Sequence, residues 1–236
     1  MSANSLQSPP DHQGWHYALH SDPQSSHQQI AQLVRRIGRG PVLDVGAAQG
    51  TLGQLLGGSG LLIDAVEPHP RWANHARSFY RNVYASGIEE AALPPATYQA
   101  VVCADVLEHV VDPVTALRHL RNAATPDALF VISLPNVAHL SARLFVLAGQ
   151  FPQMERGIFD RTHMHFYTRR TAAAMFGAAG LSVVRTRPTP VPLEVVRPRW
   201  LPDGAFAAAM GAQRLALLLA PELFGFQWIF VARANP

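Results

Sequence analysis

The sequence predicts an α/β fold built on a doubly wound, mainly parallel sheet. Two observations carry this prediction. Short apolar runs of strand length alternate with segments of helical periodicity along most of the chain, and no repeat at solenoid or propeller periods is visible. Strands that alternate with helices imply right-handed crossovers, so helices are expected on both faces of the sheet. Ligands of such sheets bind beyond the carboxyl ends of the strands, and functional residues are expected there.

The composition is that of a globular domain. The 236 residues are 48% hydrophobic and 15% charged, which is enough for a large core. Residues 1–14 are polar, without apolar periodicity and without the basic and apolar regions of a signal peptide. We therefore predict a disordered lead-in over 1–14 and one domain over 15–236. The lone cysteine, Cys103, excludes an internal disulfide and fits a cytoplasmic protein.

The basic residues of the chain are all arginines. With no lysine, Schiff-base chemistry, pyridoxal phosphate attachment and the Walker-type phosphate loop are excluded. Residues 1–118 carry seven arginines and ten acids, whereas residues 119–236 carry twelve arginines and six acids. The C-terminal half therefore favours an anionic partner or presents a solvated arginine-rich surface. Few aromatic residues lie among these arginines, so no nucleic acid is expected.

The first half of the chain opens with a helix and then alternates strands with helices. Apolar residues at helical spacing predict the opening helix, and Gly38 can end it. Three short apolar runs predict strands at residues 41–45, 61–68 and 98–105. Helical patterns follow these runs at residues 51–56, 70–80 and 113–124.

The second half continues the pattern but carries two insertions. The predicted sheet is completed by strands over 128–136, 181–186 and 225–233. A helix is predicted over 168–180, with Thr168 as its N-cap and Gly180 as its left-handed last residue. Residues at about 136–160 and 188–224 interrupt this order, and we expect them to form lids.

The second insertion contains an apolar run over 205–220. This run is too short, and too interrupted by Gln213 and Arg214, to span a bilayer. It could serve as a lid, as a dimer contact or as a site of peripheral membrane docking.

The first strand and the second each end in residues that suit a nucleoside-containing ligand. The turn "DVGAAQG" begins at Asp44 and carries Gly46 and Gly50, which allow a tight turn and a close backbone approach. A helix N-terminus follows and can face an anionic group. Glu67 ends the second run and can accept hydrogen bonds from a ribose diol. The dinucleotide pattern GxGxxG fits poorly, because Ala48 stands where its first glycine belongs.

These motifs resemble the class I S-adenosylmethionine-dependent methyltransferases, whose usual turn is close to "VLDVGCGxG". The string "YQAVVCADVLEHVVDP" at residues 98–113 is similar to one that is frequent after the third core strand of that family, and Pro135-Asn136 also matches. The resemblance runs from about residue 30 to the C-terminus. It implies a Rossmann-like sheet of seven strands with an antiparallel last strand, and S-adenosylmethionine as the cofactor.

The resemblance also implies where the cofactor lies. The turn after the first strand would hold its methionine end, Glu67 its ribose, the backbone at Gly87 its adenine, and the residues after the third core strand its sulfonium. Glu108 and His109, a feature of the family, would have a structural or positioning role. The residues expected at the cofactor are Asp44, Gly46, Ala47, Ala48, Gly50, Glu67, Pro68, Gly87, Ile88, Cys103, Ala104, Asp105 and His109.

The stretch "GIFDRTHMHFYTRR" at residues 157–170 bears on the methyl acceptor. It resembles a bacterial subgroup associated with glycan or lipid-linked sugar modification. A hydroxyl acceptor benefits from a base near its proton, and histidine titrates near neutrality. The candidate bases are His139, Asp160, His163 and His165. His163 and His165 would share a face of an extended segment, which permits a metal site without requiring one; we expect no metal.

The function expected from these motifs is methyl transfer from S-adenosylmethionine to a small molecule, with an oxygen of a sugar or sugar-bearing intermediate as the leading acceptor. The alternatives are a phenolic, quinone-type or secondary-metabolite acceptor, methylation of nitrogen, and a non-catalytic cofactor-binding partner subunit. Asp44 and the imperfect glycine pattern disfavour a nicotinamide oxidoreductase. The protein is expected to be a monomer or a homodimer.

Overall fold

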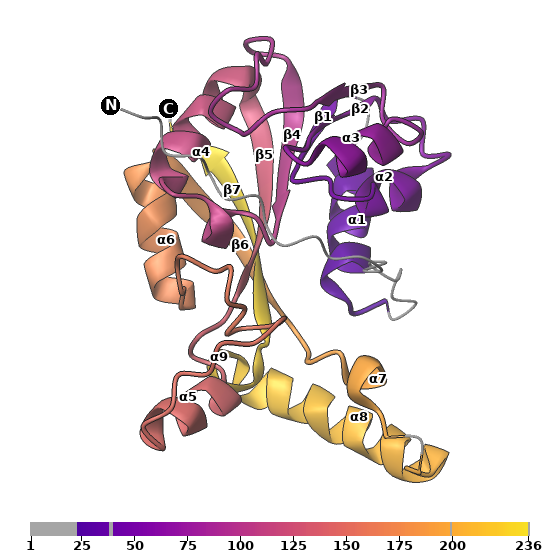
Figure 1. Ribbon diagram of the computed structural model, residues 1–236, viewed down its shortest axis with the longest axis vertical. Coiled ribbons are helices and arrows are strands. Elements are labelled where there is room, and N and C mark those ends of the chain that lie inside the picture. The colour runs from indigo at the N-terminus through magenta and orange to yellow at the C-terminus, as the bar shows by residue number, and fades with distance from the viewer. Residues whose placement is uncertain (1–22, 38–39, 199, 236) are drawn as a thin grey trace.

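One mixed sheet organises the molecule (Figure 1). The computed structural model describes residues 23–37, 40–198 and 200–235, so the predicted lead-in and Gly38, which was predicted to end the first helix, lie outside it. The described sheet has seven strands in the order β3-β2-β1-β4-β5-β7-β6. The strands are β1 (Val42–Val45), β2 (Ile63–Val66), β3 (Asn82–Tyr84), β4 (Tyr98–Ala104), β5 (Ala124–Pro135), β6 (Leu181–Thr189) and β7 (Gln227–Ala234).

The strand directions confirm the predicted fold class. Strands β1 to β5 pair in parallel, and β7 pairs antiparallel with both β5 and β6. Strand β3 was missed in the sequence because it has three residues and none of them is buried. Strand β5 begins four residues before its predicted start, and β6 continues to Thr189, which shortens the second predicted insertion.

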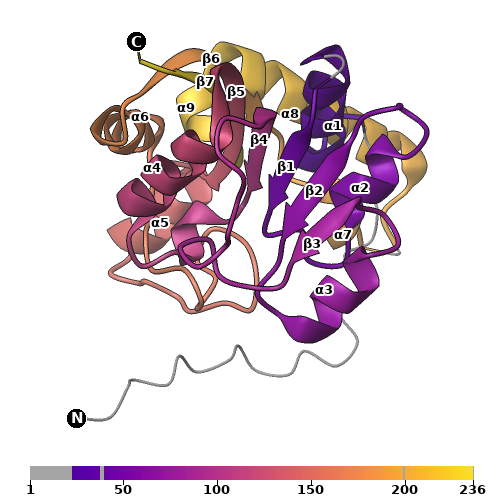
Figure 2. The same cartoon turned by 90° about the horizontal axis from the view of Figure 1, so that it is seen from above.

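Helices cover both faces of the sheet (Figure 2). Successive strand residues point to opposite faces: Leu43 packs with α4 and α6, and Val42 packs with α1, α2 and α3. The helices are α1 (Ser26–Ile37), α2 (Thr51–Leu56), α3 (Pro70–Ala76), η1 (Leu107–His109), α4 (Pro113–Ala123), α5 (Leu140–Leu147), α6 (Arg169–Ala178), α7 (Leu193–Val196), α8 (Asp203–Leu219) and α9 (Pro221–Phe224).

Helix α6 begins and ends as its sequence predicts. Thr168 and Thr171 form a capping box, in which each side chain bonds the backbone N–H of the other, and Gly180 follows the helix with φ of 76°. This cap ends the loop over residues 157–167, so the loop that holds three of the candidate bases is anchored at a well-defined point.

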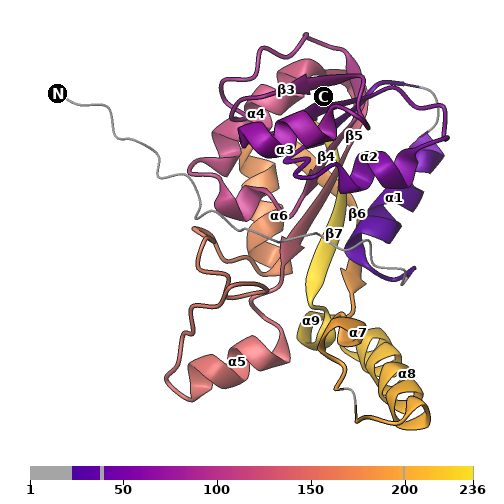
Figure 3. The same cartoon turned by 45° about the vertical axis from the view of Figure 1, so that its right-hand side comes forward.

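The two segments predicted as insertions lie beyond the carboxyl end of the sheet (Figures 1 and 3). The first contains α5, and the second contains α7, α8 and α9. Asn136 joins them: its side-chain amide is buried and donates to the backbone carbonyls of Glu222 and Gly225, at 3.1 and 2.7 Å. Within the described part of the chain, no helix combines the length and apolarity that crossing a membrane demands.

Candidate active site

The turn after β1 has a backbone that only small residues permit. Gly46 has φ of 72°, and a Cβ on it would lie 2.5 Å from Cγ2 of Val106. Gly50 has φ of 85°, and its Cβ would lie 2.6 Å from the ring of Phe79. Ala48 has φ of 47°, a left-handed conformation that is uncommon for a residue with a side chain. This turn therefore lies in close contact with Val106, in the loop after β4.

Glu67 shapes the same turn from the end of β2. Its carboxylate accepts hydrogen bonds from the backbone N–H groups of Ala48 and His69, at 2.7 and 2.8 Å. Burial raises the pKa of Glu67, and these two hydrogen bonds lower it. Both carboxylate oxygens keep a further lone pair, so the predicted contact with a ribose diol remains a prediction that this geometry permits.

Asp44 is buried at the base of the turn, and Tyr80 holds it. The Tyr80 hydroxyl donates to the Asp44 carboxylate at 2.5 Å and accepts from the backbone N–H of Gly53 at 3.0 Å. Burial raises the pKa of Asp44 to about 7, partly offset by the hydrogen bond from Tyr80. Tyr80 lies 36 residues away in the chain, and sequence patterns alone did not indicate it.

Three further residues predicted at the cofactor differ in exposure. Ile88 is buried with the core that lies under α4, and Pro68 is exposed beside Glu67. Cys103 is fully buried, and burial raises its thiol pKa far above the usual range. It is therefore a core residue and not a nucleophile.

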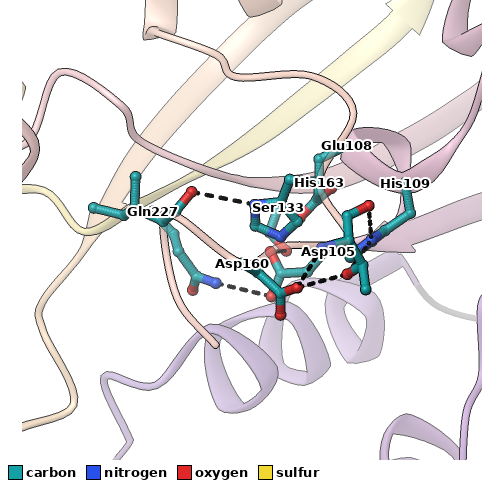
Figure 4. Close-up of polar contacts among 9 residues, drawn as sticks. Asp105, Glu108, His109, Ser133, Asp160, His163 and Gln227 are labelled. Atoms are coloured by element: carbon teal, nitrogen blue, oxygen red, sulfur yellow. Dashed lines mark hydrogen bonds and ion pairs between the residues drawn. The ribbon is translucent and has the colours of Figure 1, made fainter. Parts of the chain in front are cut away.

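Asp105 connects three strands at the carboxyl end of the sheet (Figure 4). It has φ of 55°, an uncommon conformation for a non-glycine residue. Its carboxylate accepts hydrogen bonds from Ser133 of β5 at 2.8 Å and from Gln227 of β7 at 2.9 Å. These contacts hold the backbone after β4 in a strained conformation, which is a common feature of functional sites.

The structure brings Glu108, His109 and His163 together (Figure 4). One possible ligand atom from each side chain lies within 4.8 Å of the others, and Oε1 of Glu108 is 4.0 Å from Nε2 of His163. The rings of His109 and His163 lie 4.7 Å apart in an edge-on arrangement. Glu108 has no exposed surface, whereas His109 is exposed. The cluster thus extends from the core to the surface.

Hydrogen bonds assign the tautomers of both histidines. Nδ1 of His163 is 3.2 Å from the backbone carbonyl of Ile158, so Nδ1 carries the proton. The Thr162 hydroxyl donates to Asp160 at 2.6 Å, so Nδ1 of His109 donates to the Thr162 carbonyl and hydroxyl oxygens, at 3.2 and 3.1 Å. Each histidine therefore presents the lone pair of its Nε2.

Glu108 is an exceptional residue within this cluster. Neither of its carboxyl oxygens has a hydrogen-bond partner among the residues that the structure describes. Burial raises the pKa of Glu108 well above its ordinary value, with a further contribution from Asp105. Burial also lowers the pKa of His163, which keeps its Nε2 unprotonated near neutral pH. A buried carboxyl group without a partner calls for a functional explanation.

The other candidate bases have different contacts. Nε2 of His165 faces the backbone carbonyls of Val110 and Val111 at 3.0 and 3.3 Å, so His163 and His165 do not converge on one metal site. His139 is the N-cap of α5, where its Nδ1 accepts from the backbone N–H and the hydroxyl of Ser141. Asp160 accepts hydrogen bonds from the backbone N–H and the hydroxyl of Thr162, the residue that precedes His163.

Aromatic rings lie beside His163 of this cluster. The ring of Phe166 lies 6.2 Å from that of His163 and 5.1 Å from that of Phe151, which in turn lies 4.8 Å from Phe159. Phe151 and Phe166 are both substantially exposed, as is Met164 between the two histidines of the loop. The surface next to His163 is therefore apolar and suits a flat, apolar ligand.

The strand order, the glycine turn after β1 and the acid after β2 define the class of S-adenosylmethionine-dependent methyltransferases. A family model described as a methyltransferase domain matches residues 17–186. That match spans more than half of the chain, and the chain belongs to this family. Its cofactor is S-adenosylmethionine.

Curated relatives are ubiquinone biosynthesis O-methyltransferases. The protein of Xanthomonas campestris pv. campestris (strain B100) is 27% identical over 117 residues, which are 47% of this chain and 49% of the relative. That of Aeromonas salmonicida (strain A449) is 26% identical over 153 residues, which are 60% of this chain and 63% of the relative. The chain thus spans about half of the length of the Xanthomonas relative.

Solved structures share the fold at low identity. A SAM-dependent methyltransferase from Archaeoglobus fulgidus has a TM-score of 0.61 at 18% identity, over 89% of this chain and 95% of that one. The Burkholderia thailandensis 1,6-didemethyltoxoflavin-N1-methyltransferase, with bound 1,6-didemethyltoxoflavin and S-adenosylhomocysteine, has a TM-score of 0.59 at 18% identity. The match covers 90% of this chain and 80% of the Burkholderia chain.

Proposed function

We propose that this protein methylates a hydroxyl oxygen of a small aromatic molecule, with S-adenosylmethionine as the donor. The observation that supports this most is the cluster of Glu108, His109 and His163. It begins three residues after Asp105, at the end of β4, where the family resemblance places the sulfonium. Nitrogen lone pairs and a carboxyl group at that place can activate a hydroxyl nucleophile.

The chemistry is a single in-line displacement. The acceptor oxygen donates an electron pair to the methyl carbon, the carbon–sulfur bond breaks, and its electron pair stays on sulfur, which becomes a neutral thioether. The proton of the acceptor hydroxyl passes to the cluster and from there to solvent. The cofactor supplies the reactivity, while the protein supplies alignment of the two reactants.

An aromatic acceptor, such as a phenol of quinone type, fits the surroundings of His163. Phe151, Phe159 and Phe166 form a continuous ring cluster beside it, and two of these rings are accessible to a ligand. The curated relatives are named for ubiquinone biosynthesis, whose name indicates a quinone-type product. In this proposal, residues 136–160 and the described residues of 190–224 act as lids over the acceptor.

A sugar or sugar-bearing intermediate is the second candidate acceptor. The motif at residues 157–168 resembles a subgroup associated with glycan or lipid-linked sugar modification, and the C-terminal half carries an excess of arginines that would favour an anionic sugar-bearing acceptor. The exposed rings of Phe151 and Phe166 favour a flat, apolar acceptor over a sugar, which is why we rank the sugar second.

Methyl transfer from isotope-labelled S-adenosylmethionine tests the proposal. A panel of catechols and other phenols, with nucleotide-linked and lipid-linked sugars beside them, should give labelled phenol ethers. The His163→Ala variant should lower turnover roughly 10²-fold or more and leave the affinity for S-adenosylhomocysteine unchanged. Labelled sugar with no labelled phenol would favour the second candidate. Failure of S-adenosylhomocysteine to bind at millimolar concentration would exclude both.

A further inference from the structure

We infer that Glu108, His109 and His163 form a binding site for a first-row divalent cation of the zinc class. This inference rests on the proposed function and deepens it, because it states how the cluster would activate the acceptor. Two imidazole nitrogens and one carboxylate are a donor set that catalytic zinc sites use, with a further position left for water or substrate.

The hydrogen bonds behind the two histidines point to a metal site. Each Nδ1–H donates to a backbone carbonyl, that of Ile158 for His163 and that of Thr162 for His109. Protein ligands of metal ions are commonly oriented by this kind of outer hydrogen bond, which fixes the tautomer and directs the Nε2 lone pair to the ion. Here both lone pairs are directed by the same kind of contact.

The buried carboxyl of Glu108 is the independent observation. Among the described residues, it has no hydrogen-bond donor for either oxygen, and the exposed fraction of Glu108 is 0%. A cation would supply the partner that the described residues do not. Asp105 and Asp160 also act electrostatically on Glu108, so the local field favours a positive ion.

The geometry is close to that of a bound ion. The donor atoms lie within 4.8 Å of one another, whereas tetrahedral ligands at about 2.1 Å from zinc lie roughly 3.4 Å apart. Closure by at most about 1.4 Å is within the reach of side-chain rotation, because the exposed ring of His109 can move toward the buried pair. That exposure also provides the path by which an ion would enter.

A cation here would change the role of the cluster in catalysis. A hydroxyl that coordinated the ion would release its proton to water near neutral pH, and its oxygen would then be ready to attack the methyl carbon as the carbon–sulfur bond breaks. The ion would also hold this oxygen on the side of the cofactor where β4 ends. Glu108, His109 and His163 would then be ligands, and no side chain would have to accept the proton.

Calorimetric titration of the chelator-treated, full-length protein tests the site. Zn²⁺ should bind with a stoichiometry of one, and Co²⁺ should give the visible absorption bands of a site with nitrogen donors. Mg²⁺ should bind much more weakly, because it prefers oxygen ligands. Absence of stoichiometric Zn²⁺ and Co²⁺ binding would overturn the inference.

Substitution of each ligand locates the ion. Glu108→Gln, His109→Ala and His163→Ala should each weaken Zn²⁺ binding by more than the roughly 10- to 100-fold that loss of an outer hydrogen bond costs. The matched control is His165→Ala, which removes a neighbouring histidine of the same loop and should leave the affinity unchanged. The isosteric Glu108→Gln and the exposed His109→Ala keep the test valid if His163→Ala does not fold.

The outcomes separate this inference from the proposed function. If S-adenosylhomocysteine binds and methyl transfer is insensitive to chelation, the metal site is wrong and the methyltransferase proposal stands. If the ion binds at the three residues and no acceptor is methylated, the metal site stands and the proposed reaction fails. Equal Zn²⁺ binding by the wild type and all three variants would indicate adventitious binding at other histidines and would also overturn the inference.

Discussion

At the scale of single residues, the site depends on positions whose conformation or ionisation is unusual. The turn after β1 places Gly46 against Val106, and Asp44 is buried beside the hydroxyl of Tyr80. Both features cost stability in the absence of a ligand, one through backbone conformation and the other through desolvation of a carboxylate. Residues with such unfavourable conformation or burial are common in binding sites, where the ligand contact requires them.

Gly46→Ala should weaken binding of S-adenosylhomocysteine at least 10-fold. The new methyl group would displace the side chain of Val106. The alanine backbone would also have to keep a left-handed conformation, which costs roughly 1–2 kcal/mol. Gly58→Ala is the matched control, because Gly58 has a similar φ of 74° but its Cβ would meet no described atom within 4 Å. Calorimetry and urea unfolding of both variants measure the difference; equal affinities would show that the turn does not contact the cofactor.

The carboxyl of Asp44 should make stability depend on pH. Burial raises its pKa from 3.8 to about 7, so between these values the folded state binds more protons than the unfolded state. The free energy of unfolding therefore falls as pH rises from about 4 to about 7. Asp44→Asn should remove this part of the slope, as measured by urea unfolding across that range. The exposed Asp127→Asn serves as control and should keep the wild-type slope.

At the scale of elements, hydrogen bonds fix the loops of the candidate site to the ends of neighbouring helices and strands. The capping box of Thr168 and Thr171 ends the loop of His163 and begins α6. Asn136 joins the end of β5 to the turn that follows α9. Asp105 joins β4 to β5 and β7 through two hydrogen bonds. A loop that is fixed at both ends can hold a side chain to the accuracy that catalysis needs.

Thr168→Ala should lower the free energy of unfolding by about 1 kcal/mol, the usual cost of an N-cap side chain. Thr168→Ser keeps an oxygen at the same place and should stay near the wild type. Urea unfolding measures both, with affinity for S-adenosylhomocysteine expected to be unchanged, because Thr168 is not among the residues predicted at the cofactor. Equal stability of the alanine variant would mean that water replaces the cap.

At the scale of the whole molecule, the sheet and its two helical layers form the core, and α8 stands apart from it (Figure 3). All seventeen residues of α8 are described, and none is buried. Leu218 and Leu219 near its end are 80% and 76% exposed. An exposed apolar helix of this kind contributes little to the stability of the domain that carries it.

The double substitution Leu218→Gln and Leu219→Gln should change the free energy of unfolding by no more than about 0.5 kcal/mol. Leu117→Ala is the matched comparison, since Leu117 is fully buried on α4 and its truncation should cost roughly 2–5 kcal/mol. Urea unfolding of the two variants measures both effects. A large loss in the double variant would show that α8 packs against the domain in solution.

The sequence by itself determined six strands of the sheet, the helices that flank them and the position of the glycine turn after β1. These depend on local signals: apolar periodicity, the glycines around Ala48, and the cap at Thr168. Strand β3 was not among the predicted strands, because three residues without a buried position carry no period.

Only the tertiary structure decided which candidate base lies beside Glu108 and His109. Pattern alone left four candidate bases equal, and the fold brings His163 beside Glu108 and His109, which lie more than fifty residues earlier. Two other hydrogen bonds likewise join residues that are far apart in the chain: Tyr80 donates to Asp44 across 36 residues, and Gln227 donates to Asp105 across 122 residues. The physical reason is that a side chain's partners are set by how distant strands end at one edge of the sheet, and local sequence does not encode that convergence.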